Sequence, residues 1–66
     1  MKNEASNAIS PELEYHLQAA YLSGTPITQR TSAMYRKVAL YAEKAGLSGE
    51  AAGLRKIADR LDREDS

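Results

Sequence analysis

Apolar side chains recur along this chain at helical spacing in three segments separated by short breaks. The first segment begins at Ser10-Pro11, because Ser caps helix N-termini and Pro fits the first helical position. It runs to about Ser23 and stops at Gly24, a residue that tolerates the left-handed conformation of a helix C-cap. One face of this short first helix carries its apolar side chains, which are Leu13, Leu17, Ala20 and Tyr21.

Helical periodicity is strongest in the second segment, which we predict to be a long central helix. Thr25-Pro26 repeats the Ser-Pro start signal, although Thr28 and Thr31 are also plausible caps, so three starts remain open. Residues 38–42 are apolar at five consecutive positions, which directs apolar groups all around the axis and requires neighbours on more than one side. Steps of four and three residues form a coiled-coil-like seam with one polar member. The seam consists of Ile27, Thr31, Met34, Val38, Tyr41 and Ala45.

The segment Ala45-Gly46-Leu47-Ser48 predicts a helix stop followed at once by a new helix. Gly46 fits the left-handed C-cap, Leu47 is the apolar residue that often follows such a cap, and Ser48 can cap the third helix. Because the link is so short, the two helices are expected to form either an antiparallel hairpin or a right-angled turn.

The third helix is expected to fray within residues 62–66. On its outer face, Arg55 with Asp59 and Asp59 with Arg63 have the i,i+4 spacing of ion pairs, which contribute about 0.2–0.5 kcal/mol each. Its buried side chains are predicted to be Leu54, Ile57, Ala58 and Leu61.

The predicted fold is an all-α, three-helix unit with a short first helix, a long central helix and the third helix in a helical hairpin. Residues 10–66 form a single helical domain, and residues 1–9, which are polar and lack periodicity, are predicted to be a disordered tail. With 66 residues, no cysteine and eleven alanines, the chain has little core to offset the entropy of folding. Dimerisation is therefore expected.

The charges of the chain balance, with nine basic and nine acidic side chains. The chain thus lacks the cationic excess that binding to a phosphate backbone usually needs, although residues 25–44 are locally basic. No apolar run approaches the roughly 18 to 20 residues that span a bilayer, and the N-terminus lacks a basic-then-apolar signal pattern. We therefore expect a cytoplasmic protein with no membrane partner.

No group of residues indicates catalysis or cofactor binding. Glu12 and His16 have i,i+4 spacing, but they fall on the polar side of the first helix and are interpreted as an exposed pair. Ser48-Gly49 lacks the glycine run, the fixed lysine and the preceding strand of a phosphate loop. A single histidine and no cysteine supply no zinc ligand set. We predict a non-enzymatic protein with no cofactor, no metal and no small-molecule substrate.

Residues 42–48 resemble the centre of the bacterial helix-turn-helix, with a small residue, three further residues, glycine, an aliphatic residue and Ser. The resemblance implies a DNA-binding transcriptional regulator whose following helix reads the major groove. That helix begins here with residues 49–53, which include no basic side chain. DNA binding is therefore the alternative function, with phosphate contacts expected from Arg30, Arg36 and Lys37.

The preferred interpretation is a protein-binding module that forms a homodimer through one side of the central helix and presents a second apolar face to another protein. No single helical face can bury Tyr35 and Tyr41 together, and tyrosine is enriched at binding hot spots. A small neutral dimer of this kind would act as a regulatory adaptor or as an inhibitor of a larger protein. The predicted interface residues are Tyr35, Val38, Leu40, Tyr41 and Tyr21.

Overall fold

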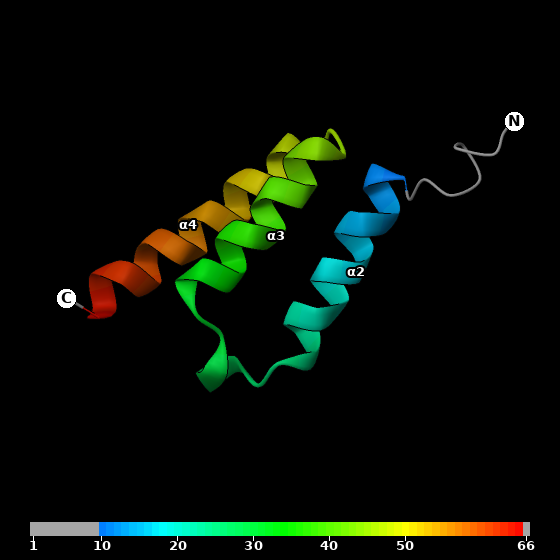
Figure 1. Cartoon of the computed structure of the whole chain (residues 1–66). Coiled ribbons are helices and arrows are strands. Elements are labelled where there is room, and N and C mark those ends of the chain that lie inside the picture. The colour runs from blue at the N-terminus through cyan, green and yellow to red at the C-terminus, as the bar shows by residue number, and fades with distance from the viewer. Residues whose placement is uncertain (1–9, 66) are drawn as a thin grey trace, which may run out of the picture.

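The structure is a computed structural model that describes residues 10–65. These residues form three α-helices and one short 3-10 helix. Helix α2 spans Pro11–Gly24, η1 spans Ile27–Gln29, α3 spans Ser32–Lys44 and α4 spans Ser48–Asp65. No strand occurs in this part of the chain, so the all-α prediction is confirmed (Figure 1).

The middle position is taken by α3, whose backbone lies close to both α2 and α4. The backbones of α2 and α4 do not come close to each other, although Leu22 of α2 and Ala58 of α4 belong to the same buried group. Each outer helix therefore has one covered side and one uncovered side (Figure 1). The prediction of a central second helix is confirmed, but its predicted length is wrong, because α3 has 13 residues against 14 in α2 and 18 in α4. The tail predicted at residues 1–9 lies outside the described residues.

Helix α2 begins where the Ser-Pro signal places it. The Ser10 Oγ accepts a hydrogen bond from the Leu13 N–H at 3.1 Å, which satisfies one of the unpaired donors of the first turn. At the other end the prediction is wrong, because Gly24 is helical and Thr25, with φ −88°, is the C-cap. The side chains of Thr25 and Arg30 donate to carbonyls of the last turn, so no left-handed residue is needed there.

Helix α3 begins after Thr31, the last of the three starts that the sequence left open. The Thr31 Oγ1 accepts a hydrogen bond from the Met34 N–H at 3.2 Å. Thr25-Pro26 instead leads into η1, and Ile27 there is exposed, outside the seam predicted for it. This later start accounts for the short central helix.

The turn between α3 and α4 is a Schellman motif centred on Gly46, which has a φ of 79°. The Gly46 N–H donates to the Glu43 carbonyl at 2.9 Å, and the Leu47 N–H donates to the Ala42 carbonyl at 2.8 Å. The predicted stop is thus confirmed. Ser48, however, is the first residue of α4, not the cap before it, because helical bonding already includes the Leu47 carbonyl, which accepts from the Ala51 N–H.

The core is thin and consists of two adjoining groups of buried side chains. Leu22 of α2 packs with Tyr35, Val38 and Ala58, and the second group contains only alanines. Four of the seven buried apolar residues are alanines, which let α3 and α4 approach closely but bury little area each. Ile57, predicted to be buried, is partly exposed. The buried alanines are Ala39, Ala42, Ala51 and Ala58.

Three ion pairs join α3 to α4. Near the start of α3, Arg36 donates through Nη2 to Asp59 Oδ1 at 2.8 Å and through Nη1 to Asp62 Oδ2 at 2.9 Å. Near its end, Glu43 Oε1 accepts from Arg55 Nη2 at 2.8 Å. Because the start of α3 pairs with the C-terminal half of α4, the two helices run in opposite directions. The ion pairs predicted within α4 are replaced at Arg55 and Asp59 by partners on α3.

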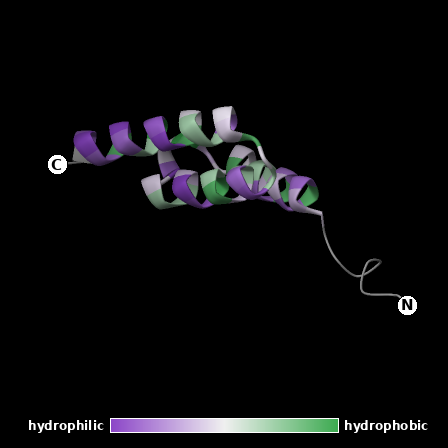
Figure 2. Ribbon diagram, turned by 90° about the horizontal axis from the view of Figure 1, so that it is seen from above, coloured by the Kyte–Doolittle hydropathy of each residue, from purple (hydrophilic) through white to green (hydrophobic). Residues whose placement is uncertain are grey.

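These exposed ion pairs change the protonation equilibria of two carboxyl groups. The Arg55 hydrogen bond lowers the pKa of Glu43. A hydrogen bond from the Ser32 side chain, followed by the bond from Arg36, lowers the pKa of Asp62. Exposed pairs stabilise a fold only weakly, so these three contribute little to the stability of the α3–α4 pair. The C-terminal turns of α4 are mostly hydrophilic (Figure 2).

Candidate functional site

The five side chains predicted to form an interface lie in different environments. Tyr35 and Val38 are buried between α3 and its neighbours, so they belong to the chain's own core. Tyr41 is half-buried, with the Lys44 Nζ 5.3 Å from its ring centroid in a cation–π contact. Leu40 is 57% exposed and Tyr21 is 70% exposed. The structure therefore leaves Leu40, Tyr21 and part of Tyr41 free to meet another molecule.

Leu40 is a single apolar side chain in a polar setting. Lys37 and Lys44 lie three and four residues away on the same face of α3, and both are exposed. Isolated exposed leucines are normal on protein surfaces. Leu40 alone is therefore a weak candidate for a binding surface.

A continuous apolar surface runs along the outer side of α2. Leu13 is 50% exposed, Leu17 is 54% exposed, and Tyr21 follows at the next i+4 position, with the exposed Ala20 beside them. We call these four residues the α2 stripe. The opposite side of α2 packs on α3 through Tyr15, Ala19 and Leu22. Helix α2 is thus apolar on both sides, and only one of them is covered.

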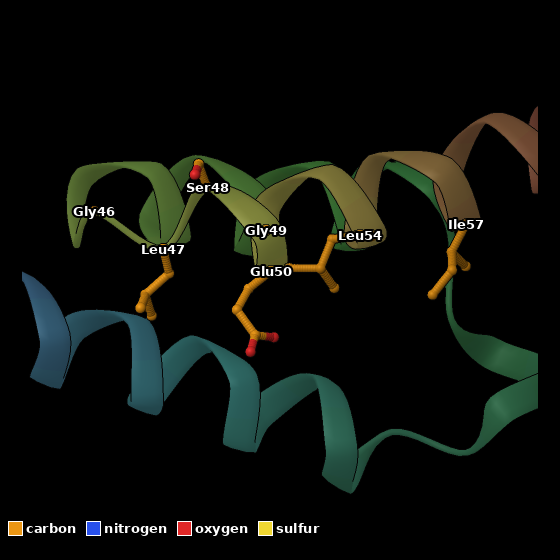
Figure 3. Close-up of a pocket in the computed structure, with 8 residues that line it drawn as sticks. Gly46, Leu47, Ser48, Gly49, Glu50, Leu54 and Ile57 are labelled. Atoms are coloured by element: carbon orange, nitrogen blue, oxygen red, sulfur yellow. The ribbon is translucent and has the colours of Figure 1, made fainter.

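The second candidate is a hollow beside the start of α4, with a volume of about 630 Å³. Figure 3 shows Leu47, Glu50, Leu54 and Ile57 extending to the same side, whereas the Ser48 hydroxyl points away. We call this the α4 hollow. The absence of side chains at Gly49 and Gly53, where an added Cβ would meet nothing within 4 Å, keeps its rim open. The complete lining is Gly46, Leu47, Ser48, Gly49, Glu50, Gly53, Leu54 and Ile57.

Sequence reasoning missed this hollow, because it assigned Ile57 to the core and considered residues 49–53 only for their lack of basic side chains. The sequence feature that could have indicated the hollow is the pair Gly49 and Gly53 within the first turns of a helix. Glycine in a helix interior costs roughly 0.5–1 kcal/mol relative to alanine. Two such residues four positions apart indicate a helix side that stays free of side chains.

Two of the three predicted phosphate contacts already have partners within the chain. Arg30 donates through Nε to the Thr25 carbonyl at 2.8 Å and through Nη2 to the Ser23 carbonyl at 3.2 Å. Arg36 holds Asp59 and Asp62, as described above. Only Lys37 is exposed with no such contact. Arg30 and Arg36 would therefore have to give up these partners before they could contact phosphates.

Acid–base and metal chemistry find little support in residues 10–65. They contain no group of three or more His, Cys, Asp or Glu side chains placed to hold a metal ion. His16 is exposed, and its ring lies 5.4 Å from that of Tyr15. None of the described helices combines the length and the apolar composition needed to cross a membrane.

Compared with known proteins, the chain matches no family model, no curated protein and no solved structure. The two candidate binding surfaces are the α2 stripe and the α4 hollow.

Proposed function

We propose that this chain is a small, non-enzymatic protein-binding module that forms a homodimer and acts as a regulatory adaptor or inhibitor of a larger protein. One observation carries the proposal, which is the exposure of Leu13, Leu17 and Tyr21 along one side of a helix. A chain with so little buried area would gain more from covering these side chains than from leaving them in water.

The grouping of exposed apolar side chains on one side of α2 supports an interface more strongly than their total exposed area does. Single apolar side chains are common on surfaces, whereas a contiguous apolar patch on a small protein is typical of a binding site. Tyrosine is among the residue types that contribute most to binding, because it adds a large contact area and a polar tip at low entropic cost. Tyr21, at one end of the α2 stripe, has these properties.

DNA binding is the less supported function. The helices of a DNA-binding helix-turn-helix meet at about 90–120°, whereas ion pairs at both ends hold α3 and α4 in opposite directions. Arg30 and Arg36 would have to leave their intramolecular partners to contact phosphates. Glu50 near the start of α4 would add a repulsive charge.

Sedimentation equilibrium over a range of concentrations, at two salt levels and with or without random duplex DNA, separates the two functions. We expect a concentration-dependent dimer that salt hardly affects and that does not co-sediment with DNA. Because phosphate contacts release counterions, a DNA binder would show co-sedimentation that weakens steeply with salt. That result, or a monomer at every concentration, would contradict the proposal.

The interaction with a larger protein is tested at the α4 hollow. We expect immobilised Ile57→Asp to lose proteins that the wild-type chain captures from cell extract. Leu40→Asp, which adds the same charge on the far side of α3, is the matched control and should keep them. Equal capture by wild type and both variants would show that the hollow does not bind a partner.

A further inference from the structure

We propose that the α2 stripe is the seam of a two-fold symmetric dimer, in which α2 of a second copy packs antiparallel and the two Leu17 side chains meet at the axis. This inference rests on the homodimer of the proposed function and adds the surface and the orientation. It differs from the expectation that the central helix forms the dimer contact.

The shape of the stripe favours a second α2 as its occupant. Leu13, Leu17 and Tyr21 are spaced by four residues, so at about 1.5 Å per residue they rise about 12 Å along α2, in a row that is inclined to the helix axis. A second helix with the same row can pack against it at a crossing angle. In the antiparallel arrangement Leu13 faces Tyr21 of the second copy, and each large side chain has an apolar neighbour.

The charges of α2 select the antiparallel orientation. Its first turn is acidic, with Glu12 and Glu14, and its last turn is bonded by the Arg30 guanidinium, which donates to the Ser23 carbonyl. An antiparallel pair places the acidic turn of one copy beside Arg30 of the other and also opposes the two helix dipoles. A parallel pair would place the four glutamates together, which is unfavourable.

The area of the stripe sets the strength of the dimer. A stable interface buries about 800 Å² on each partner, and three large side chains with Ala20 supply only part of that area. We therefore expect a dissociation constant on the order of micromolar, so that the dimer forms and separates with concentration.

The dimer would leave the α4 hollow open. The stripe lies on the side of α2 opposite the side chains that pack on the core, and the lining of the hollow comes from the α3–α4 turn and from α4, so the two surfaces share no residue. A dimer therefore presents two copies of the hollow, which gives an adaptor two equal binding positions.

Single cysteines test the seam and its orientation, because the chain contains no cysteine of its own. A disulfide needs Cβ atoms about 3.8 Å apart. Under mild oxidation we expect Leu17→Cys to form disulfide-linked dimers rapidly, and Leu13→Cys to do so only when mixed with Tyr21→Cys. Leu40→Cys, at a position of nearly equal exposure on α3, is the control and should remain largely unlinked.

Faster linkage of Leu13→Cys to itself than of Leu17→Cys would overturn the antiparallel orientation. Linkage of Leu40→Cys as fast as Leu17→Cys would overturn the seam. Leu17→Asp adds a second readout, because it places two like charges at the axis. We expect it to weaken the dimer at least tenfold in sedimentation equilibrium while its circular dichroism stays that of the wild type, and we expect Leu40→Asp to leave the dimer unchanged.

The outcomes separate this inference from the proposed function. A wild-type dimer that Leu17→Asp leaves intact would contradict the seam but not the homodimer. A wild-type chain that stays monomeric well above micromolar concentration would contradict both.

Discussion

Gly46 shows what one residue contributes to this fold. Its φ of 79° lies in the left-handed region, where a Cβ is strained, and the two hydrogen bonds of the Schellman turn depend on that conformation. The sequence predicted this turn correctly, because the Gly-Leu pair follows directly after an apolar helix. Gly24 suggests a similar C-cap in the sequence, but it does not adopt the left-handed conformation. The side chains of Thr25 and Arg30 instead donate to carbonyl groups at that end of α2.

We expect Gly46→Ala to lower the free energy of unfolding by about 1 kcal/mol, because alanine is strained in the left-handed region. Gly53→Ala, which meets nothing within 4 Å, is the matched control, and it should raise the free energy of unfolding by roughly 0.5–1 kcal/mol through helix propensity. Urea denaturation of both variants measures the difference. A change of the same sign in the two would contradict the assignment of strain to Gly46.

Charged residues were the hardest to place from the sequence. The i,i+4 spacing within α4 predicted partners for Arg55 and Asp59 on their own helix, but the structure pairs them with Glu43 and Arg36 on α3. Spacing along one helix detects only its own surface neighbours. The register between two helices, which decides these contacts, depends on the packing of small alanines that periodicity does not resolve.

Helix α2 carries two apolar stripes, and this limited what the sequence could predict about it. Leu13, Leu17 and Tyr21 have helical spacing, and so do Tyr15, Ala19 and Leu22 on the other side. Periodicity identified the first set without deciding which set would meet α3. The structure packs the second set on the core, where Leu22 is buried and Tyr15 and Ala19 are partly buried, and it leaves the first set exposed because no helix covers that side of α2.

The start of α3 depends on a single cap. We expect Thr31→Ala to lower the free energy of unfolding by about 1 kcal/mol, because the Met34 N–H loses the Thr31 hydroxyl and keeps only the Thr31 carbonyl as an acceptor. Thr28→Ala, in η1 and exposed, should change it by less than about 0.5 kcal/mol. Thermal and urea denaturation of the two variants, side by side, test the boundary. Equal effects would mean that Thr31 does not cap α3.

At the scale of the whole molecule, the sequence predicted the fold class and the central helix, but the five residues that it assigned to an interface lie in different environments. Tyr35 and Val38 have the composition of an interface and belong to the core. Leu17, the middle of the largest exposed stripe, was assigned to a helix face and not to a site. Cores and interfaces use the same residues, so composition alone cannot separate them in so small a protein.

We expect the stability of the whole molecule to depend on pH through two carboxyl groups that form ion pairs between α3 and α4. The pKa values of Glu43 and Asp62 are lower in the folded protein than their ordinary values of 4.5 and 3.8. Folding therefore releases protons in this range, and the extra stability is complete above about pH 4.5 and is lost as the pH falls through the folded pKa values. We expect the free energy of unfolding to decrease over this acidic window.

Urea denaturation between neutral and acidic pH measures this decrease. A variant with Arg36→Ala and Arg55→Ala is the control, because its carboxyl groups no longer have cationic partners and its acid dependence should be weaker. A profile as steep as that of the wild type would show that other groups cause the effect.

The Arg30 side chain has a consequence for the motion of α2. This side chain donates hydrogen bonds to the carbonyls of Ser23 and Thr25. These bonds hold the segment between α2 and α3, which includes η1, against the end of α2. Residues 25–30 are thereby tied to α2 and not free to act as a flexible linker. If α2 swings away from α3, the connection moves with it as one body, and the rotation concentrates in the backbone beside Thr31, where α3 begins.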